Sequence, residues 1–150
     1  MQTKSEKATE LFETGYNCAQ SVFCAFAEDL GLDFETALKL SSSFGGGMGR
    51  LREVCGAVSA MFMITGIKFG YTTPNNDSIK QAHYERIQKL AEDFEAKHNT
   101  IICREILGLP KGKDTPVPTK RTSEYYQTRP CEKCIADAAE IISNYIKNNQ

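Results

Sequence analysis

The sequence predicts an all-α protein, a single domain over residues 1–150 built as a bundle of about six to seven helices. Apolar residues recur along most of the chain with a period close to 3.6, the period of a helix that is buried on one face. Strand signals are scarce, because the most β-like run, MFMIT at 61–65, lies inside a longer helix-compatible stretch. A chain of 150 residues most simply forms one domain.

Capping and breaking residues divide the chain into helices. Asn17, followed three residues later by Gln20, has the form of a capping box, and Asp33 is a good cap for the next helix. Gly15 and Gly31 end the first two helices. The proline-containing segment 110–127 is predicted as a loop. The expected helices cover about residues 3–14, 18–30, 34–43, 50–68 and 78–97, then a short helix that ends at Gly108 and a last helix that begins near Pro130.

Composition and charge exclude several classes of function. The formal net charge of −1 argues against nucleic-acid binding, which needs a clustered basic excess. No stretch approaches the ~20 uninterrupted apolar residues of a membrane span, so we expect no membrane insertion. The polar start, MQTKSEKATELF, has no apolar signal core, and we therefore expect a cytoplasmic protein.

The chain contains six cysteines, which is unusual for a chain whose composition is otherwise that of an ordinary globular protein. A chain of this length needs no disulfides to fold, so in a reducing cytosol they indicate metal ligation, redox chemistry or buried thiols. Cys18, Cys103 and Cys131 fall in the first turns of expected helices, where the helix dipole lowers a thiol pKa. Cys55 is expected about one turn inside the helix at 50–68. The remaining two are Cys24 and Cys134.

Four glycines lie close together just before the helix at 50–68. Such residues adopt positive φ and can form a concave nest of N–H groups for an anion, or admit a bulky group to the backbone. An iron–sulfur cluster fits both descriptions. Phosphate fits less well, because the segment lacks the lysine and serine or threonine of a P-loop. The alternative is that the glycines only allow a sharp turn. They are Gly45, Gly46, Gly47 and Gly49.

Cys131 and Cys134 form a CxxC pair at an expected helix start, the arrangement of thioredoxin-type sites, and are candidates for redox thiols. Cys24 lies six residues after Cys18, about 240° around a helix, and is expected to be a small buried side chain. Neither histidine, His83 or His98, has a partner at ligand spacing, so both are expected to be structural or exposed.

Five stretches together resemble the C-GCAxxG-C-C family, which is named for its cysteine pattern and described as redox-active: GYNCAQ (15–20), FGGGMGR (44–50), VCGAVSAM (54–61), CREILG (103–108) and PCEKCIADAAEI (130–141). The resemblance covers nearly the whole chain and implies a bacterial or archaeal protein that holds an iron–sulfur cluster or another metal. It assigns the family's four cysteines to Cys18, Cys55, Cys103 and Cys131, and it names no reaction or substrate.

This chain departs from the family pattern at one position. The pattern reads Cys-Gly-Ala-x-x-Gly, whereas CGAVSA has Ala60 in the last glycine place. Alanine is the better helix former by about 1 kcal/mol, and Ala60 is not a ligand, so the change is expected to affect local packing alone.

Three hypotheses follow. In the first, Cys18, Cys55, Cys103 and Cys131 converge from four helices on an iron–sulfur cluster, or on zinc, with the four glycines closing around it and Arg50 and Arg52 balancing its charge. The function is then electron transfer or redox sensing with a redox protein partner. In the second, a metal-free thiol–disulfide oxidoreductase uses Cys131 with Cys134 or a neighbouring cysteine. In the third, the chain is a structural or interaction domain. Exposed apolar residues on the helix at 50–68 would favour a homodimer.

Overall fold

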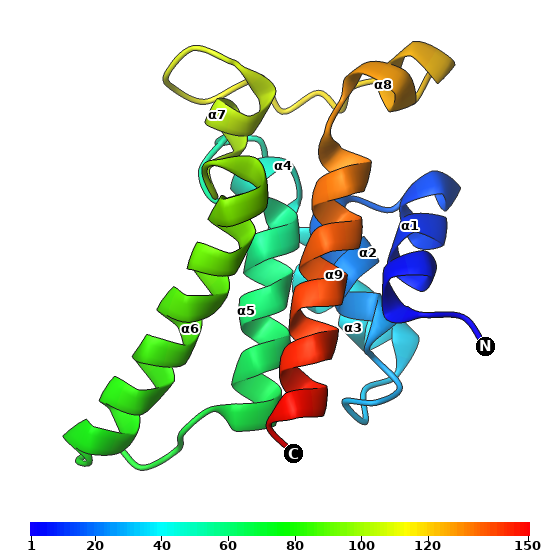
Figure 1. The fold of residues 1–150 in the computed structure, drawn as a ribbon. Helices are drawn as coiled ribbons and strands as arrows, with labels where there is room; N and C mark the ends of the chain where they lie inside the picture. The colour runs from blue at the N-terminus through cyan, green and yellow to red at the C-terminus, as the bar shows by residue number, and fades with distance from the viewer.

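The computed structural model of residues 1–150 is an all-α bundle, as the sequence predicts (Figure 1). Its three longest helices, α5 (Gly56–Phe69), α6 (Asp77–His98) and α9 (Cys131–Asn148), lie side by side. Helices α1 (Lys4–Thr14) and α2 (Cys18–Ala25) cover the other side of α9, and α3 (Phe34–Ser42) packs on α2. No helix combines the length and the apolar character needed to cross a membrane.

The core lies where α1, α2, α5, α6 and α9 meet. Helix α5 is apolar on nearly all sides because it is surrounded by α2, α6 and α9. Each large side chain fully buried there contributes about 1.5–3 kcal/mol relative to an exposed one. The largest are Phe12, Phe23, Phe26, Phe94, Met61, Ile64, Leu90, Ile135 and Ile142.

The capping residues act as their sequence positions predict. The Asn17 side chain accepts a hydrogen bond from the Gln20 backbone N–H at 2.9 Å, and the Gln20 side chain accepts one from the Asn17 N–H at 3.1 Å. Asp33 caps α3 through the Thr36 N–H at 3.0 Å. These bonds satisfy backbone N–H donors at the starts of α2 and α3. They also fix the position of Cys18, which is the first residue of α2.

The start of α5 was predicted wrongly, because the helix begins at Gly56 and not at residue 50. The backbone has positive φ at Met48, Arg50 and Arg52, a conformation that no right-handed helix contains. The following residues form an isolated antiparallel bridge between Val54 and Ile102 instead. Helix α2 is also shorter than predicted, since it ends at Ala25 and a turn follows it.

Three short segments complete the fold at the end of the bundle where α5 and α9 begin (Figure 1). The element α4 (Gly45–Met48) is a glycine turn, not a regular helix, since Gly46 and Gly47 have positive φ. Helix α7 spans Cys103–Leu107, and α8 spans Ser123–Thr128, where residues up to 127 were predicted as a loop. Helix α8 buries no residue, so its sequence has no apolar periodicity that would predict a helix. With these short elements, the helices outnumber the expected six to seven.

Candidate functional site

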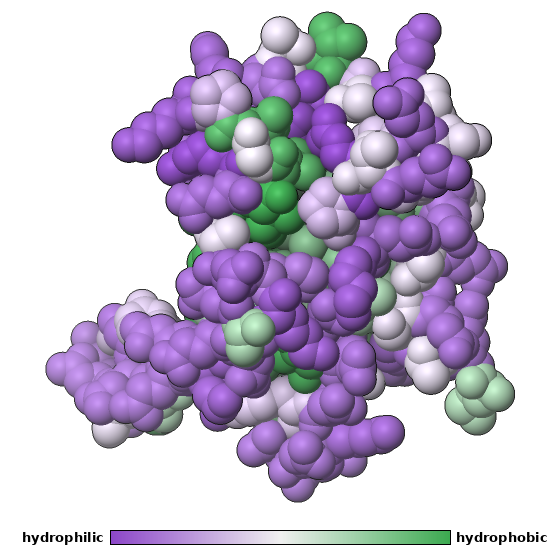
Figure 2. Space-filling view, turned by 45° about the horizontal axis from the view of Figure 1, so that its top comes forward, coloured by the Kyte–Doolittle hydropathy of each residue, from purple (hydrophilic) through white to green (hydrophobic).

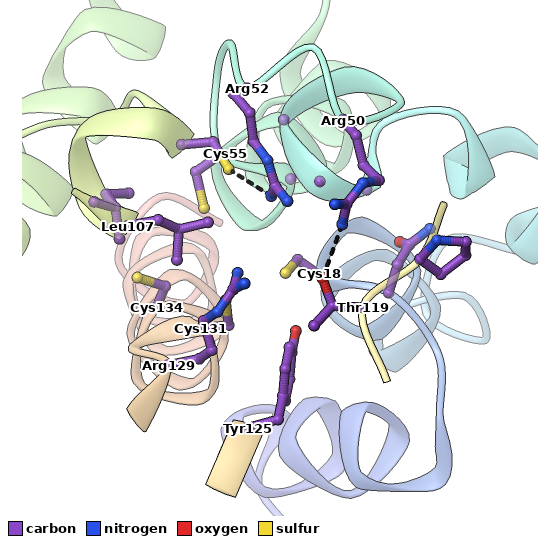
Figure 3. A pocket seen from close by; sticks show the side chains of 18 of the residues that line it. Cys18, Arg50, Arg52, Cys55, Leu107, Thr119, Tyr125, Arg129, Cys131 and Cys134 are labelled. Carbon is purple, nitrogen blue, oxygen red and sulfur yellow. Dashed lines mark hydrogen bonds between the residues drawn. The ribbon is translucent and has the colours of Figure 1, made fainter. Parts of the chain in front are cut away.

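Five of the six thiols line one cavity of about 230 Å³ at the α4–α7–α8 end of the bundle (Figure 3). Seen from this end, the molecule has a hollow with an apolar floor among hydrophilic side chains (Figure 2). The sixth thiol, Cys24, is buried in the core, as predicted. The cavity thiols are Cys18, Cys55, Cys103, Cys131 and Cys134.

Four helices deliver a thiol to the cavity at their N-termini. Cys18, Cys103 and Cys131 are the first residues of α2, α7 and α9, so their predicted first-turn positions are confirmed. Cys55 lies at the N-cap of α5 and not one turn inside a helix, because α5 starts after it. The backbone N–H groups of Ala57 and Val58, in the first turn of α5, lower the pKa of its thiol. Four helix dipoles therefore point their positive ends at one space.

The glycine segment allows the chain to come close to these thiols. Gly45, Gly46 and Gly47 line the cavity, whereas Gly49 ends α4 outside its lining. A Cβ atom at Gly47 would lie 2.6 Å from the Cβ of Cys103, and the φ of Gly47 is +71°. No other residue type fits this position without moving Cys103.

A second close approach at a glycine was not predicted. A Cβ atom at Gly56 would lie 2.9 Å from the Phe44 carbonyl oxygen and 3.0 Å from the Ala19 nitrogen. Gly56 thus lets the start of α5 pack against the start of α2, which brings Cys55 and Cys18 to the same cavity.

The pKa values of Cys18 and Cys131 depend on each other. The hydrogen bond from Cys18, the nearby Arg129 charge and the Tyr125 hydroxyl together lower the pKa of Cys131 to about 7, against the effect of burial. The same hydrogen bond, with burial, raises the pKa of Cys18 well above its ordinary value. Near neutral pH, a substantial fraction of Cys131 is therefore thiolate, whereas Cys18 keeps its proton.

Cys55 and Cys134 form a second pair of the same kind. The hydrogen bond from Cys134 lowers the pKa of Cys55, and the α5 backbone N–H groups act in the same direction. The pKa of Cys134 is raised by this bond and by burial. The two cysteines of the CxxC motif thus both reach the cavity, but their hydrogen bonds run to different partners.

Cys103 has a buried arginine as its partner. Burial raises the pKa of the Cys103 thiol, and the hydrogen bond from Arg52 Nη1, 3.5 Å from the sulfur, opposes this effect. Arg52 is only 4% exposed, and its other guanidinium nitrogen contacts Asp114 at 3.0 Å. Arg50 contacts the same Asp114 carboxylate at 3.1 Å, so two arginines share one counter-charge.

The cavity lining contains no Asp, Glu or His side chain, whereas it contains four arginines. Arg121 donates to the Phe12 and Tyr16 carbonyl oxygens, both at 3.0 Å, and forms no ion pair. Arg129 also forms no ion pair, and its guanidinium stands 5.3 Å from the Tyr125 ring centre. Figure 3 shows Arg50, Arg52 and Arg129 directed toward the space between the thiols. The lining is therefore strongly cationic and suits an anionic content.

Cys134 contacts a chain of polar side chains that the sequence did not predict. His98 Nδ1 lies 3.7 Å from its sulfur, and His98 Nε2 lies 2.8 Å from Asp137 Oδ2. Lys133 donates to the other Asp137 oxygen at 2.7 Å. The i, i+3 spacing of Cys134 and Asp137 on one helix face was a usable signal. The α6 residue that meets them could not be foreseen from spacing.

The thiols surround a space and do not close on a point. No group of three or more Cys, His, Asp or Glu side chains is arranged to hold a single metal ion. Ala60, where the chain departs from the Cys-Gly-Ala-x-x-Gly pattern, is fully buried in the core and is not part of the cavity lining.

Comparison with known proteins gives a family but no individual relative. The searches of curated proteins and of solved structures found no match. A family model described as "Putative redox-active protein (C_GCAxxG_C_C)" matches residues 16–145, which include all five thiols of the cavity. Because this match covers most of the chain, the protein belongs to the C_GCAxxG_C_C redox-active family.

Proposed function

We propose that this protein binds an iron–sulfur cluster through Cys18, Cys55, Cys103 and Cys131 and uses it for electron transfer or redox sensing. The observation that carries the proposal is the convergence of these four thiols, each at a helix N-terminus, on one cavity whose charged lining is arginine alone. This proposal extends to a cytoplasmic location, because a reducing compartment keeps the thiols available as ligands.

The donor set fits such a cluster. Soft thiolate ligands favour iron–sulfur clusters, zinc and Cu(I), and the lining offers sulfur without imidazole or carboxylate. Zinc is the alternative guest, but Zn–S bonds of about 2.3 Å require thiols that close on one point. The thiols here surround a cavity of about 230 Å³ and include no group set for a single ion. The space therefore favours a multinuclear guest over one ion.

The chain's own residues supply the electrostatic environment. Four helix N-termini and four arginines stabilise negative charge on the sulfurs, and one carboxylate, Asp114, offsets part of that field. Arg52 donates a hydrogen bond to the sulfur of Cys103, and the first backbone N–H groups of α5 lower the pKa of Cys55. A bound cluster would supply one-electron redox chemistry, whose potential depends on such hydrogen bonds and on exposure.

The fifth thiol, Cys134, has a supporting role in this proposal. Its contact with His98 at 3.7 Å and its hydrogen bond to Cys55 hold it at the wall of the cavity. It therefore orients Cys55 and excludes water from it, while the other four thiols ligate.

Cysteine-to-serine variants test the ligand set. In protein purified without oxygen, Cys55→Ser should lose most of its iron and acid-labile sulfide. Cys24→Ser is the matched control, since Cys24 is equally buried but lies in the core, and it should keep both. Equal iron content in the Cys55→Ser variant and the unmodified protein would contradict the assignment of Cys55 as a ligand.

The two thiol pairs favour a second candidate function, a metal-free thiol–disulfide oxidoreductase. A thiolate with a pKa of about 7 at Cys131, in contact with the Cys18 thiol, is an arrangement that can form and break a disulfide. This candidate predicts a reversible Cys18–Cys131 disulfide after mild oxidation, mapped by peptide mass spectrometry. A Cys131–Cys134 disulfide would instead support the CxxC pair, and the absence of any disulfide would exclude the candidate.

A further inference from the structure

The end of the molecule that carries the cavity is basic, although the whole chain has a net charge of −1. Segments 50–53 and 104–129, which surround the opening, contain eight Lys and Arg against four Asp and Glu. The rest of the chain contains ten basic and fifteen acidic side chains. The charge of the protein is therefore divided between a positive end and a negative body.

Ion pairs within this end leave several of its basic side chains without a carboxylate partner. Asp114 is bound by Arg50 and Arg52, and Glu53 is bound by Arg104 at 3.4 Å. These pairs use two of the four carboxylates and three of the eight basic side chains, so the end keeps its net positive charge. Three exposed lysines and Arg129 form no ion pair with any carboxylate. We call this group the basic rim: Lys111, Lys113, Lys120 and Arg129.

The loop that carries the three lysines is tied to the cavity. The Asp114 N–H donates to the Arg50 carbonyl oxygen at 2.9 Å. Arg50 Nε donates to the Thr115 carbonyl oxygen at 2.6 Å, and Arg50 Nη1 donates to the Thr119 hydroxyl at 3.1 Å (Figure 3). Because Pro118 and Thr119 line the cavity itself, these bonds hold the lysines on either side of the loop near its opening.

Apolar side chains lie beside the same charges. Val117 is 67% exposed in the loop, and Leu51, next to Arg50, is 48% exposed. Exposed apolar side chains next to charged ones are found in transient protein–protein interfaces. It is less suited to a polyanion such as nucleic acid, which would extend past four cations onto a negatively charged body.

We propose that the basic rim docks an acidic protein, a one-electron carrier that exchanges electrons with the thiol-lined site. This inference rests on the proposed function. In the reducing direction, one electron leaves the redox centre of the partner, which is oxidised, and enters the site, which is reduced, without any bond forming or breaking. The positive end attracts the acidic surface from a distance and turns the cavity opening toward it.

The test measures binding to a defined acidic probe. A labelled plant-type ferredoxin, which is strongly acidic, is titrated with this protein and followed by fluorescence anisotropy, and basic cytochrome c serves as the opposite probe. We expect the ferredoxin to bind at low salt and cytochrome c to bind far more weakly. Binding should weaken roughly tenfold or more at about 0.3 M salt, where the Debye length is below about 8 Å.

A matched pair of triple variants locates the surface. Lys111→Glu, Lys113→Glu and Lys120→Glu together should weaken ferredoxin binding roughly tenfold or more. In the control variant, Lys68→Glu, Lys80→Glu and Lys147→Glu make an equal charge change at the opposite end of α5, α6 and α9. This control should change ferredoxin binding less than about threefold. All six lysines lie at or near the surface, and far-UV circular dichroism checks that both variants fold.

Three results would overturn the proposal: no binding of ferredoxin at low salt, equal loss in the two triple variants, or tighter binding of a single-stranded oligonucleotide than of ferredoxin. Because docking does not require iron, it is measured on both cluster-loaded and iron-free protein. If protein purified without oxygen contains no iron and still docks as expected, the docking surface stands and the iron–sulfur proposal is refuted. If cluster-loaded protein does not bind the ferredoxin, the proposed docking partner is refuted and the iron–sulfur proposal stands.

Discussion

Cys18 and Cys131 both begin helices that point into the cavity, yet their pKa values move in opposite directions. A helix N-terminus favours thiolate at each sulfur, but two adjacent thiolates repel each other, so one proton remains between them. Arg129 and Tyr125 stand beside Cys131, and they decide which sulfur holds the negative charge. The pKa of Tyr125 itself rises to about 12, chiefly through burial and then through the neighbouring thiols, so its hydroxyl remains a donor.

The protonation of Cys131 gives a prediction for alkylation. In reduced, metal-free protein, its reaction with iodoacetamide should rise through pH 7, because thiolate is the reactive form, while Cys18 should react slowly at the same pH. Arg129→Gln removes a positive charge that lowers the pKa of Cys131, so its profile should shift to higher pH. Arg86→Gln, an arginine remote from the cavity, should leave the profile unchanged, and equal profiles in both variants would refute the role of Arg129.

Gly47 is a residue where conformation and packing both require glycine. Gly47→Ala should reduce the free energy of unfolding by about 2–4 kcal/mol, from the strained positive φ and from the clash with Cys103. Gly108→Ala is the matched control, since Gly108 has a similar φ of +68° and nothing within 4 Å of a new Cβ, and it should cost about 1–2 kcal/mol. Urea denaturation of both variants measures the difference, and equal losses would show that the Cys103 contact carries no energy.

Helices α6 and α9 are joined beside the site by the His98–Asp137 contact. Asp137 is buried and accepts hydrogen bonds from His98 and Lys133, and its contact with His98 crosses from α9 to α6. Although burial alone would raise the pKa of Asp137, these partners lower it. The stabilisation is therefore complete above the ordinary carboxyl pKa of about 4 and is lost as the pH falls through the lower folded value.

Removing this contact should loosen the pair of helices. Asp137→Ala leaves His98 without its partner in a buried place and should cost about 1.5–3 kcal/mol of unfolding free energy at pH 7. Asp93→Ala removes an exposed carboxylate paired with Lys89 at 2.6 Å on α6 and should cost less than about 0.5 kcal/mol. Thermal unfolding at pH 7 compares the two variants. If Asp137→Ala is no more destabilising than Asp93→Ala, the buried contact does not join the helices.

The elements differ in how far local sequence determines them. The starts of α1, α2 and α3 follow from nearby caps, since Thr3, Asn17 and Asp33 each accept a hydrogen bond from the N–H three residues on. Segment 50–55 could not be predicted this way, because Arg50 and Arg52 adopt positive φ against their own preference. What holds them is distant: Arg50 bonds to Thr115 and Thr119, and Arg52 bonds to Asp114 and Cys103.

The same division applies to the candidate site. Three cysteines could be placed at helix starts from the sequence, because caps and helix periodicity are local signals. The pairing of Cys131 with Cys18 and of Cys134 with Cys55 depends on how α2, α5 and α9 pack, and no spacing within one helix encodes it. The His98–Cys134 contact joins α6 to α9 and was missed for the same reason.

On the scale of the whole molecule, the apolar core and the candidate site lie in different parts of the fold. The body of the bundle buries an apolar core between α1, α2, α5, α6 and α9, which supplies stability. The end built from α4, α7 and α8 contains the thiols, the arginines and the basic rim, and it contributes little to that core. Substitutions of exposed side chains at this end, such as the lysines of the basic rim, can therefore change docking with small effects on folding.

The most direct test of the central claim is the visible absorption spectrum of the unmodified protein purified without oxygen, together with its iron, acid-labile sulfide and zinc contents. We predict brown protein that contains iron and sulfide and bleaches on reduction. Colourless protein with stoichiometric zinc would contradict the cluster and make the site a zinc centre. Colourless protein without metal would also contradict it, and would leave the thiol pairs Cys18–Cys131 and Cys55–Cys134 as the redox-active groups.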